Sequence, residues 1–208
     1  MKDLKIKGNP GKGNSFSQIS MKSVGNYNPN AHTAITHIHN EGYHTPSRMD
    51  AYFQALLDDI EKKVKKETID ELRYYVTKLP GTKPVEEKLA DGGFSQSSID
   101  EAVRLKEIYA KRAEMYDCYP SAQQIILLLF ARIKNEFNTS IYPLIEDGIS
   151  LRTIMEQLRT KIVIPIMQEL DVHGVHDHYL NFTEDHIYGM IYYLTGMCHL
   201  NWRDYDNV

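Results

Sequence analysis

From residue 47 to the end of this 208-residue chain, apolar residues recur at the three- and four-residue spacing of amphipathic helices. The first 46 residues show no such period, because they are rich in Gly, Asn, Ser and Thr and their apolar residues are scattered. The pattern therefore predicts two parts: a polar arm over residues 1–46 and an all-α domain over residues 47–208.

The all-α domain is expected to contain six or seven helices. Ser47 and Asp50 form a capping box before the first helix, and Ser98 and Glu101 form another before the fourth. Pro165 interrupts the sixth apolar pattern, where it predicts a kink or a break. The seven patterns run over residues 49–64, 69–79, 84–91, 98–116, 124–137, 150–162 and 183–198.

The fifth pattern is apolar on all sides over Gln124–Ala131, which predicts a central helix with neighbours around it. A buried strand is the competing interpretation of such a run. Ile133 and Phe137 continue the helical period beyond the usual length of a strand, so a helix is favoured.

The polar arm contains one strand-like stretch, Ala34–His39, between turn-forming residues. A metal site at His32, His37 and His39 is an alternative, but a short alternating stretch is more typical of a polar edge strand. The arm has too little apolar surface to order itself, so we expect short strands that add to a second copy or to a partner protein. This predicts self-association or partner binding through the arm.

Residues 8–15 contain the glycines and the lysine of a phosphate-binding loop. Gly13 follows Lys12, however, where that motif requires Ser or Thr. We therefore expect no nucleotide site in the arm and no cofactor.

Charge and cysteine content narrow the class of protein. The net charge is −4, which argues against a protein held on nucleic acid mainly by positive charge. Acidic residues are interleaved with the basic clusters at 62–66 and 104–112, as on solvated helix faces, and a nucleic-acid sensor stays open as an alternative. The chain has two cysteines, too few for a disulfide scaffold, which predicts a reduced, cytoplasmic protein. A membrane span needs about 20 apolar residues in a row, and no apolar run is that long, so no membrane segment is expected.

Three histidines, His173, His176 and His178, suggest a metal-dependent enzyme as a second alternative, because neutral imidazoles bind zinc and iron. Asp171, Asp177 and Glu184 are the carboxylates that could complete such a site. The spacing matches no known ligand pattern, and Gly174 favours a solvated loop. Cys198 and His199 are neighbours on the expected last helix, where they point about 100° apart and cannot pair. With no other catalytic signature in the sequence, we expect a protein that is not an enzyme.

The last helix has an unusual composition. Its glycines lower helix propensity by about 1 kcal/mol each relative to Ala, and helices keep them for close packing or for a functional contact. Tyr, Trp and Arg are enriched at binding hot spots, so we expect a partner-binding surface here. The residues assigned to this surface are Tyr188, Gly189, Tyr192, Tyr193, Gly196, His199, Trp202 and Arg203.

The ending Ile187–Trp202 (IYGMIYYLTGMCHLNW) resembles the terminal motif of a C-terminal domain of bacterial ABC-three-component conflict systems. Val85–Gly93 resembles that family's acidic turn ending in glycines, and Ser121–Ile125 resembles its central helix. Phe137 and Pro143–Ile145 resemble the segment that follows the central helix. The resemblance covers about residues 47–203, with Met197 in place of the family's Asn before Cys-His.

The resemblance implies a role in defence against phage. In such systems an SMC- or Rad50-like ABC ATPase acts with a small middle component and with a third protein, which carries this all-α domain after an effector. The domain would couple the effector to the ATPase. The 46 residues before the all-α domain contain no catalytic signature, so we expect a stand-alone adaptor, or a version whose arm does the effector's work. Its expected partners are the ABC ATPase and the middle component.

Overall fold

The computed structural model describes residues 47–78 and 82–203, all of which belong to one unit, Tyr43–Val208. The arm over residues 1–46 lies outside the described residues, and so do its expected strand, the candidate ligands His32, His37 and His39, and its glycine-lysine stretch. Self-association through the arm therefore stays a prediction.

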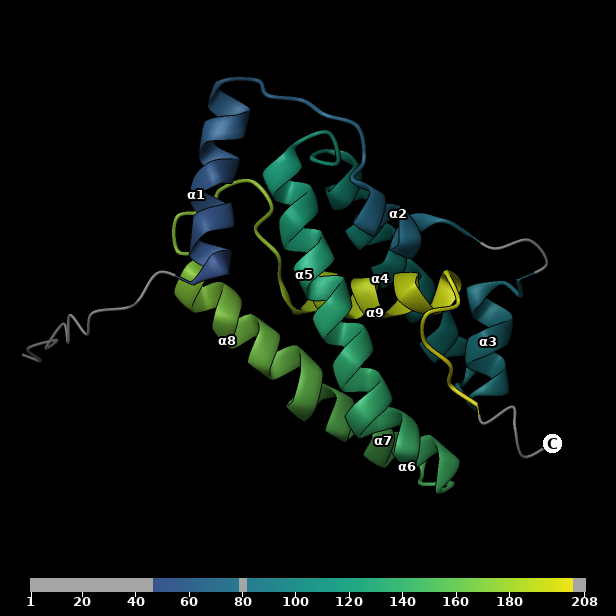
Figure 1. The fold of residues 1–208 in the computed structure, drawn as a ribbon. Coiled ribbons are helices and arrows are strands. Elements are labelled where there is room, and N and C mark those ends of the chain that lie inside the picture. Colours follow the sequence, from purple (N-terminus) through teal and green to yellow (C-terminus); the bar gives the residue numbers. More distant parts are fainter. Residues whose placement is uncertain (1–46, 79–81, 204–208) are drawn as a thin grey trace, which may run out of the picture. The chain divides into compact units, whose positions relative to one another are not determined.

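The described residues form an all-α domain, as the sequence predicts (Figure 1). Two short π-helical segments each continue the α-helices on either side, so the described ranges contain seven continuous helices. The elements are α1 (Arg48–Glu61), α2 (Asp70–Val76), α3 (Val85–Asp91), α4 (Gln96–Glu114), α5 (Pro120–Glu136), a π segment (Phe137–Ile141), α6 (Tyr142–Glu146), α7 (Leu151–Leu158), a second π segment (Arg159–Val163), α8 (Ile164–His173) and α9 (Glu184–Gly196).

Two capping predictions are tested directly. The capping box of α1 is confirmed: the Ser47 N–H donates to Asp50 Oδ2 at 2.6 Å, and the Asp50 N–H donates to Ser47 Oγ at 3.1 Å. The box predicted at Ser98 is wrong. α4 begins three residues earlier, because Ser95 Oγ accepts a hydrogen bond from the Ser98 N–H at 3.3 Å and so acts as the N-cap.

Two prolines lie inside long helices without ending them. Pro143 and Pro165 each follow a π-helical segment by two residues. Proline lacks an N–H and crowds the carbonyl four residues before it, and the wider π turn shifts the hydrogen-bond register just ahead of that position. At Pro165 the helix therefore continues through the π segment to His173, and no break occurs (Figure 1).

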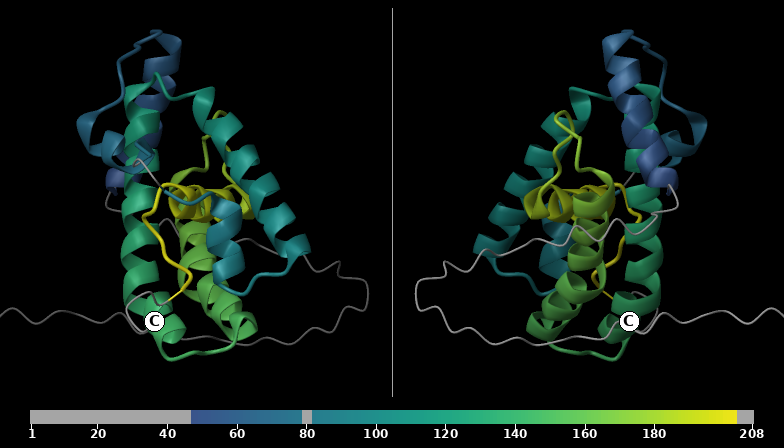
Figure 2. Two further views of the ribbon diagram at one scale, coloured as in Figure 1. Left: turned by 90° about the vertical axis from the view of Figure 1, so that its right-hand side faces the viewer. Right: turned by 90° about the vertical axis from the view of Figure 1, so that its left-hand side faces the viewer.

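The core is built around α5 and α9. α5 contacts α1, α2 and α9, which confirms its predicted central place. α9 runs across the other helices and packs most extensively on α4 (Figures 1 and 2). Gly189 permits this close approach, since a Cβ there would lie 2.4 Å from the Leu105 carbonyl oxygen and 2.6 Å from Tyr109 Cβ. No helix in the described ranges is long and apolar enough to cross a membrane.

Candidate functional site at the end of helix α9

The end of α9 is a tight turn that the sequence pattern does not predict. α9 ends at Gly196, so Cys198 is not the helical residue expected from its spacing. The Cys198 N–H donates to the Thr195 carbonyl at 3.1 Å, and the His199 N–H donates to the Leu194 carbonyl at 2.9 Å. This is the Schellman arrangement, in which the residue after the cap is left-handed and is usually glycine. Here that residue is Cys198, with φ 67°.

A buried lysine from α3 holds this turn. Lys88 Nζ donates to the carbonyl oxygens of Thr195 at 2.7 Å and Gly196 at 3.3 Å, and it lies 2.8 Å from Cys198 Sγ. Carbonyls at the end of a helix lack intrahelical donors and form the negative end of its dipole, so a cation is favoured there. Lys88 is 7% exposed, and these contacts offset the free-energy cost of burying its charge.

Trp202 packs on the other side of the same turn. Its Nε1 donates to Thr195 Oγ1 at 2.9 Å, and its ring makes edge contacts with Phe94 and Phe137. Gly92 allows Trp202 to approach, because a Cβ on Gly92 would lie 2.6 Å from Trp202 Cβ and 3.0 Å from the Trp202 carbonyl oxygen. The segments Val85–Gly93 and Ile187–Trp202 therefore meet in space and form one joint between α3 and α9.

The structure divides the residues expected to form a partner surface. Gly189, Tyr192 and Trp202 are buried in the domain's own core, which leaves a partner no access to them in this fold. The residues that keep accessible surface are Tyr188, Tyr193, Gly196 and His199, which are half-buried, and Arg203, which is exposed. Internal packing thus explains the signals at Gly189 and Trp202, whereas Gly196 has no such close neighbour.

Three hollows open around the end of α9. The first, of about 230 Å³, lies between α2, α4, α5 and α9. A second, of about 250 Å³, lies between α3, α4 and α9 and shares Tyr193 with the first. A third, of about 470 Å³, lies between α2 and the turn, where the ring centroids of Tyr74 and His199 are 4.8 Å apart. Of the half-buried residues of the predicted surface, Tyr193 lines the first two hollows, Gly196 lines the second and His199 lines the third.

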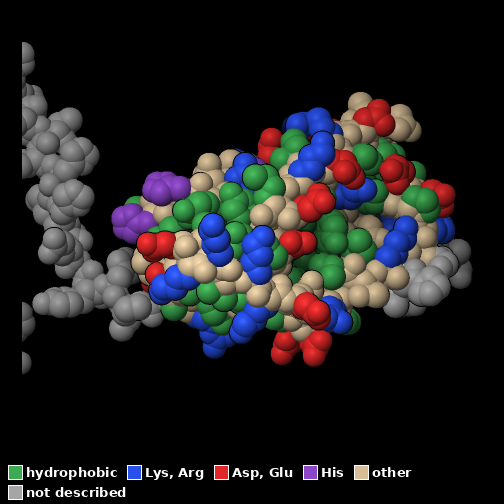
Figure 3. All heavy atoms as spheres, turned by 90° about the horizontal axis from the view of Figure 1, so that it is seen from above, with side chains coloured by type: hydrophobic (Ala, Val, Ile, Leu, Met, Phe, Trp, Pro, Cys, Tyr) green, Lys and Arg blue, Asp and Glu red, His purple; other side chains and the backbone are tan. Residues whose placement is uncertain are grey.

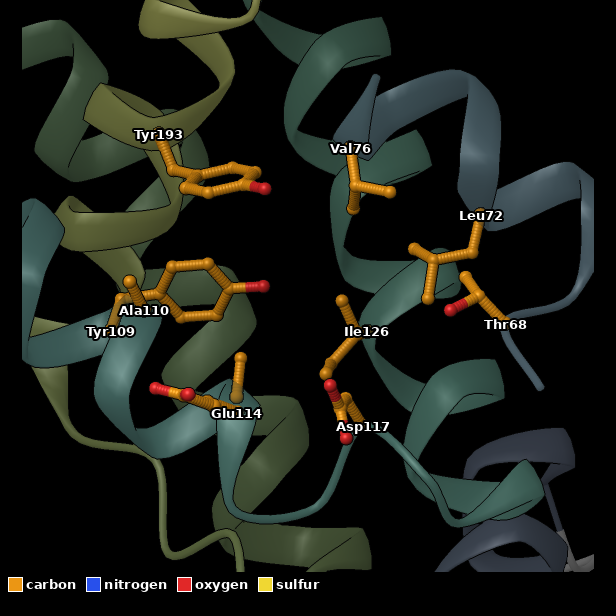
Figure 4. Close-up of a pocket in the computed structure, with 10 residues that line it drawn as sticks. Thr68, Leu72, Val76, Tyr109, Ala110, Glu114, Asp117, Ile126 and Tyr193 are labelled. Atoms are coloured by element: carbon orange, nitrogen blue, oxygen red, sulfur yellow. The ribbon is translucent and has the colours of Figure 1, made fainter. Parts of the chain in front are cut away.

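Figure 4 shows the first hollow, which contains residues that the sequence analysis missed. The rings of Tyr109 on α4 and Tyr193 on α9 are 5.4 Å apart, and both hydroxyl groups point across the hollow toward Val76 and Ile126 (Figure 4). Burial raises the pKa of both phenols, for Tyr109 well above its ordinary value, so both hydroxyls stay protonated. Tyr109 gave no signal in the sequence because it falls on the apolar stripe of α4.

The histidines near the end of α8 do not converge. His173 Nδ1 lies 2.8 Å from Asp50 Oδ1, which ties the end of α8 to the first turn of α1. The Asp177 carboxylate accepts hydrogen bonds from the backbone N–H groups of the three residues at 179–181. His176 and His178 are exposed, and no cluster of three potential metal ligands occurs within residues 47–78 and 82–203. The structure therefore gives no support to a metal centre at His173, His176 and His178.

Basic side chains are distributed among acidic ones. Lys62 pairs with Asp58 at 2.8 Å, and Arg104 pairs with Glu101 at 2.5 Å. On the face shown in Figure 3, Lys and Arg are interspersed with Asp and Glu and with apolar side chains. This distribution is typical of solvated helix faces and does not form a continuous basic stripe on that face.

Comparison with known proteins identifies the family. Residues 84–202 match the family model described as C-terminal domain 9 of the ABC-three component (ABC-3C) systems. The match includes both segments of the α3–α9 joint, while α1 and α2 lie before it. No curated protein and no solved structure matches the chain. The chain therefore belongs to the C-terminal domain 9 family and is a component of an ABC-3C system.

Proposed function

We propose that this chain is a non-enzymatic, cytoplasmic adaptor of a bacterial anti-phage system, which links an ABC ATPase and a middle component to an effector. Membership of a family that occurs in multi-component systems is the observation that carries the proposal. A domain of such a system needs surfaces for the other components.

The end of α9 is the surface that fits this role. The half-buried residues from Tyr193 to His199 are held by rigid packing on their inner side, through Lys88 and Trp202. On their outer side they line three hollows. Binding surfaces of this kind, with partly buried aromatic side chains on a fixed scaffold, lose little side-chain entropy when a partner docks.

The test is co-expression of the tagged full chain with the ABC ATPase and the middle component of its own system, followed by affinity purification. We expect both proteins to co-purify with the chain. If neither protein forms a complex with the chain at any salt concentration that keeps all three folded, the adaptor proposal is wrong.

Self-association through residues 1–46 belongs to the same proposal and needs its own measurement. Deletion of residues 1–44 removes the arm and leaves Ser47, which caps α1 through Asp50. We expect unchanged helicity together with a loss of self-association or of partner binding. Loss of helicity in the deletion variant would show instead that the arm packs into the core.

A further inference from the structure

Two tyrosine hydroxyl groups face the hollow between α2, α4, α5 and α9. Tyr109 is 2% exposed, and its hydroxyl points into the hollow (Figure 4). Within the described ranges neither the Tyr109 nor the Tyr193 hydroxyl forms a hydrogen bond with another residue. These hydroxyl groups open into the hollow, where they can hydrogen-bond with water or with a ligand, whereas phenylalanine would fill the same space without that capacity. The hydroxyl of Tyr109 therefore points to a ligand that enters the hollow.

The charges along the hollow are of one sign. Its only ionisable side chains besides the tyrosines, among the residues described, are Glu114 and Asp117. In Figure 4, Asp117 points toward Ile126, whereas Glu114 lies below Tyr109 with its carboxylate turned away from Ile126. Both are exposed, and neither forms an ion pair with a described residue. Glu114 is also the last residue of α4, where the helix dipole disfavours a carboxylate.

Apart from Thr68, the remaining walls are apolar. They consist of Leu72 and Val76 from α2, Ala110 and Ala113 from α4, and Ile126 from α5. The volume, about 230 Å³, is below the roughly 300–1,000 Å³ of most small-molecule sites and suits a single side chain. An aliphatic stem can pack on these walls while a cation at its end lies near the carboxylates and the tyrosine rings.

We propose that this hollow receives a lysine or arginine side chain from an otherwise apolar segment of a partner protein. The tyrosine oxygens accept hydrogen bonds from the cation, Glu114 and Asp117 neutralise it, and the apolar walls bury its stem. This inference rests on the proposed adaptor function and names the chemistry of one partner contact.

The first test separates binding from stability with Tyr109→Phe in the full chain. This variant removes only a hydroxyl that bonds to no other described residue, so we expect resistance to urea to change little. The probes are three capped peptides that differ only at the central residue: acetyl-Leu-Lys-Leu-amide, its Arg counterpart and its norleucine counterpart. NMR shifts of the tyrosine ring protons report their binding.

We expect either basic peptide to bind about tenfold more tightly than the norleucine peptide, as for one hydrogen-bonded charge pair. This preference should shrink in Tyr109→Phe. It should also disappear in Glu114→Lys/Asp117→Lys but persist in the matched control Glu146→Lys/Asp147→Lys, whose exposed residues lie on and just after α6. Equal binding of all three peptides, or no binding of any, overturns the proposal, and a preference for Lys over Arg identifies the cation.

Co-purification distinguishes this inference from the proposed function. If the unmodified chain captures no partner but still prefers the basic peptides, the adaptor proposal fails and the hollow keeps its assigned chemistry. If the chain captures partners equally well with Glu114→Lys/Asp117→Lys and with the control pair, the partner docks elsewhere and the inference is wrong. Partner capture that is lost only in the Glu114→Lys/Asp117→Lys variant supports both.

Discussion

Lys88 Nζ on α3 lies 2.8 Å from Cys198 Sγ in the turn that follows α9. The same ammonium group donates to two carbonyls at the end of α9, across 107 residues of sequence in the case of Thr195. One side chain thus satisfies the C-terminal end of a buried helix and fixes α3 against it. Val85–Gly93 and Ile187–Trp202, which both lie within the residues that match the family, meet at this joint.

Replacing Lys88 tests whether the joint stabilises the domain. In Lys88→Met the carbonyls of Thr195 and Gly196 lose their donor, and we expect the free energy of unfolding to fall by roughly 1–2 kcal/mol. Relief from burying an ammonium group offsets part of the loss. Urea unfolding measures the change against Lys161→Met, which alters an exposed lysine. Equal or higher stability of Lys88→Met would show that the desolvation cost outweighs the hydrogen bonds.

Cys198 has an unfavourable backbone conformation, while its Sγ accepts a contact from Lys88 Nζ. Its φ of 67° costs a non-glycine residue roughly 1–2 kcal/mol, a cost that glycine does not have. We therefore expect Cys198→Gly to be more stable than Cys198→Ala by about 1 kcal/mol, since both lack Sγ and differ only in backbone freedom. Thermal or urea unfolding of the pair decides this. Equal stability of the two variants would mean that the turn relaxes without the cysteine.

The sequence predicts the helices well because their apolar stripes have the helical period. It also predicts the cap at Ser47, where a serine and an acidic residue are three positions apart. At the start of α4 the same rule selects Ser98, whereas Ser95 provides the oxygen. Four residues, Ser95 to Ser98, offer three hydroxyl groups, so composition alone cannot locate the cap.

The candidate site was only partly predictable. Glycine and aromatic residues mark both close packing and binding surfaces, and at Gly189 and Trp202 the tertiary contacts decide for packing. Tyr109 lies on an apolar stripe, so nothing in the pattern shows that its hydroxyl faces a hollow. The position of this hydroxyl in a hollow is determined only by the packing of α2, α5 and α9 around α4.

The two glycines of α9 form a matched pair for a packing prediction. Gly189→Ala places a Cβ within 2.4 Å of the Leu105 carbonyl oxygen, so α9 and α4 must move apart. We expect a loss of roughly 1–3 kcal/mol or more, which exceeds the gain in helix propensity. Gly196→Ala meets nothing closer than Val85 Cβ at 3.8 Å and should change stability little. The prediction is wrong if urea unfolding shows the same stability for both variants.

His186 makes the domain sensitive to mild acid. Its Nδ1 accepts a hydrogen bond from the Thr183 N–H at 3.1 Å, so this nitrogen must be unprotonated for the cap of α9 to form. Burial lowers the pKa of His186, and the charge of Arg112 lowers it further. As the pH falls through about 6.5, the unfolded chain takes up the proton first, and the free energy of unfolding decreases until the folded pKa is reached. Burial also lowers the pKa of His199, which acts in the same pH range.

Substitution of His186 by glutamine separates the contribution of His186 to the pH dependence from that of His199. Gln at this position can still complete a capping box but does not titrate. We expect the loss of stability between pH 7.5 and pH 5.5 to be smaller in His186→Gln than in the unmodified chain, with the remainder due to His199. His178→Gln is the control, since His178 is exposed in the loop before α9. Urea unfolding at the two pH values gives the comparison.

Asp50 does not interfere, because its pKa is lowered by the Ser47 backbone N–H and its contribution is lost only below about pH 4. An equal acid-induced loss in the unmodified chain and in His186→Gln would show that the cap of α9 tolerates a protonated imidazole.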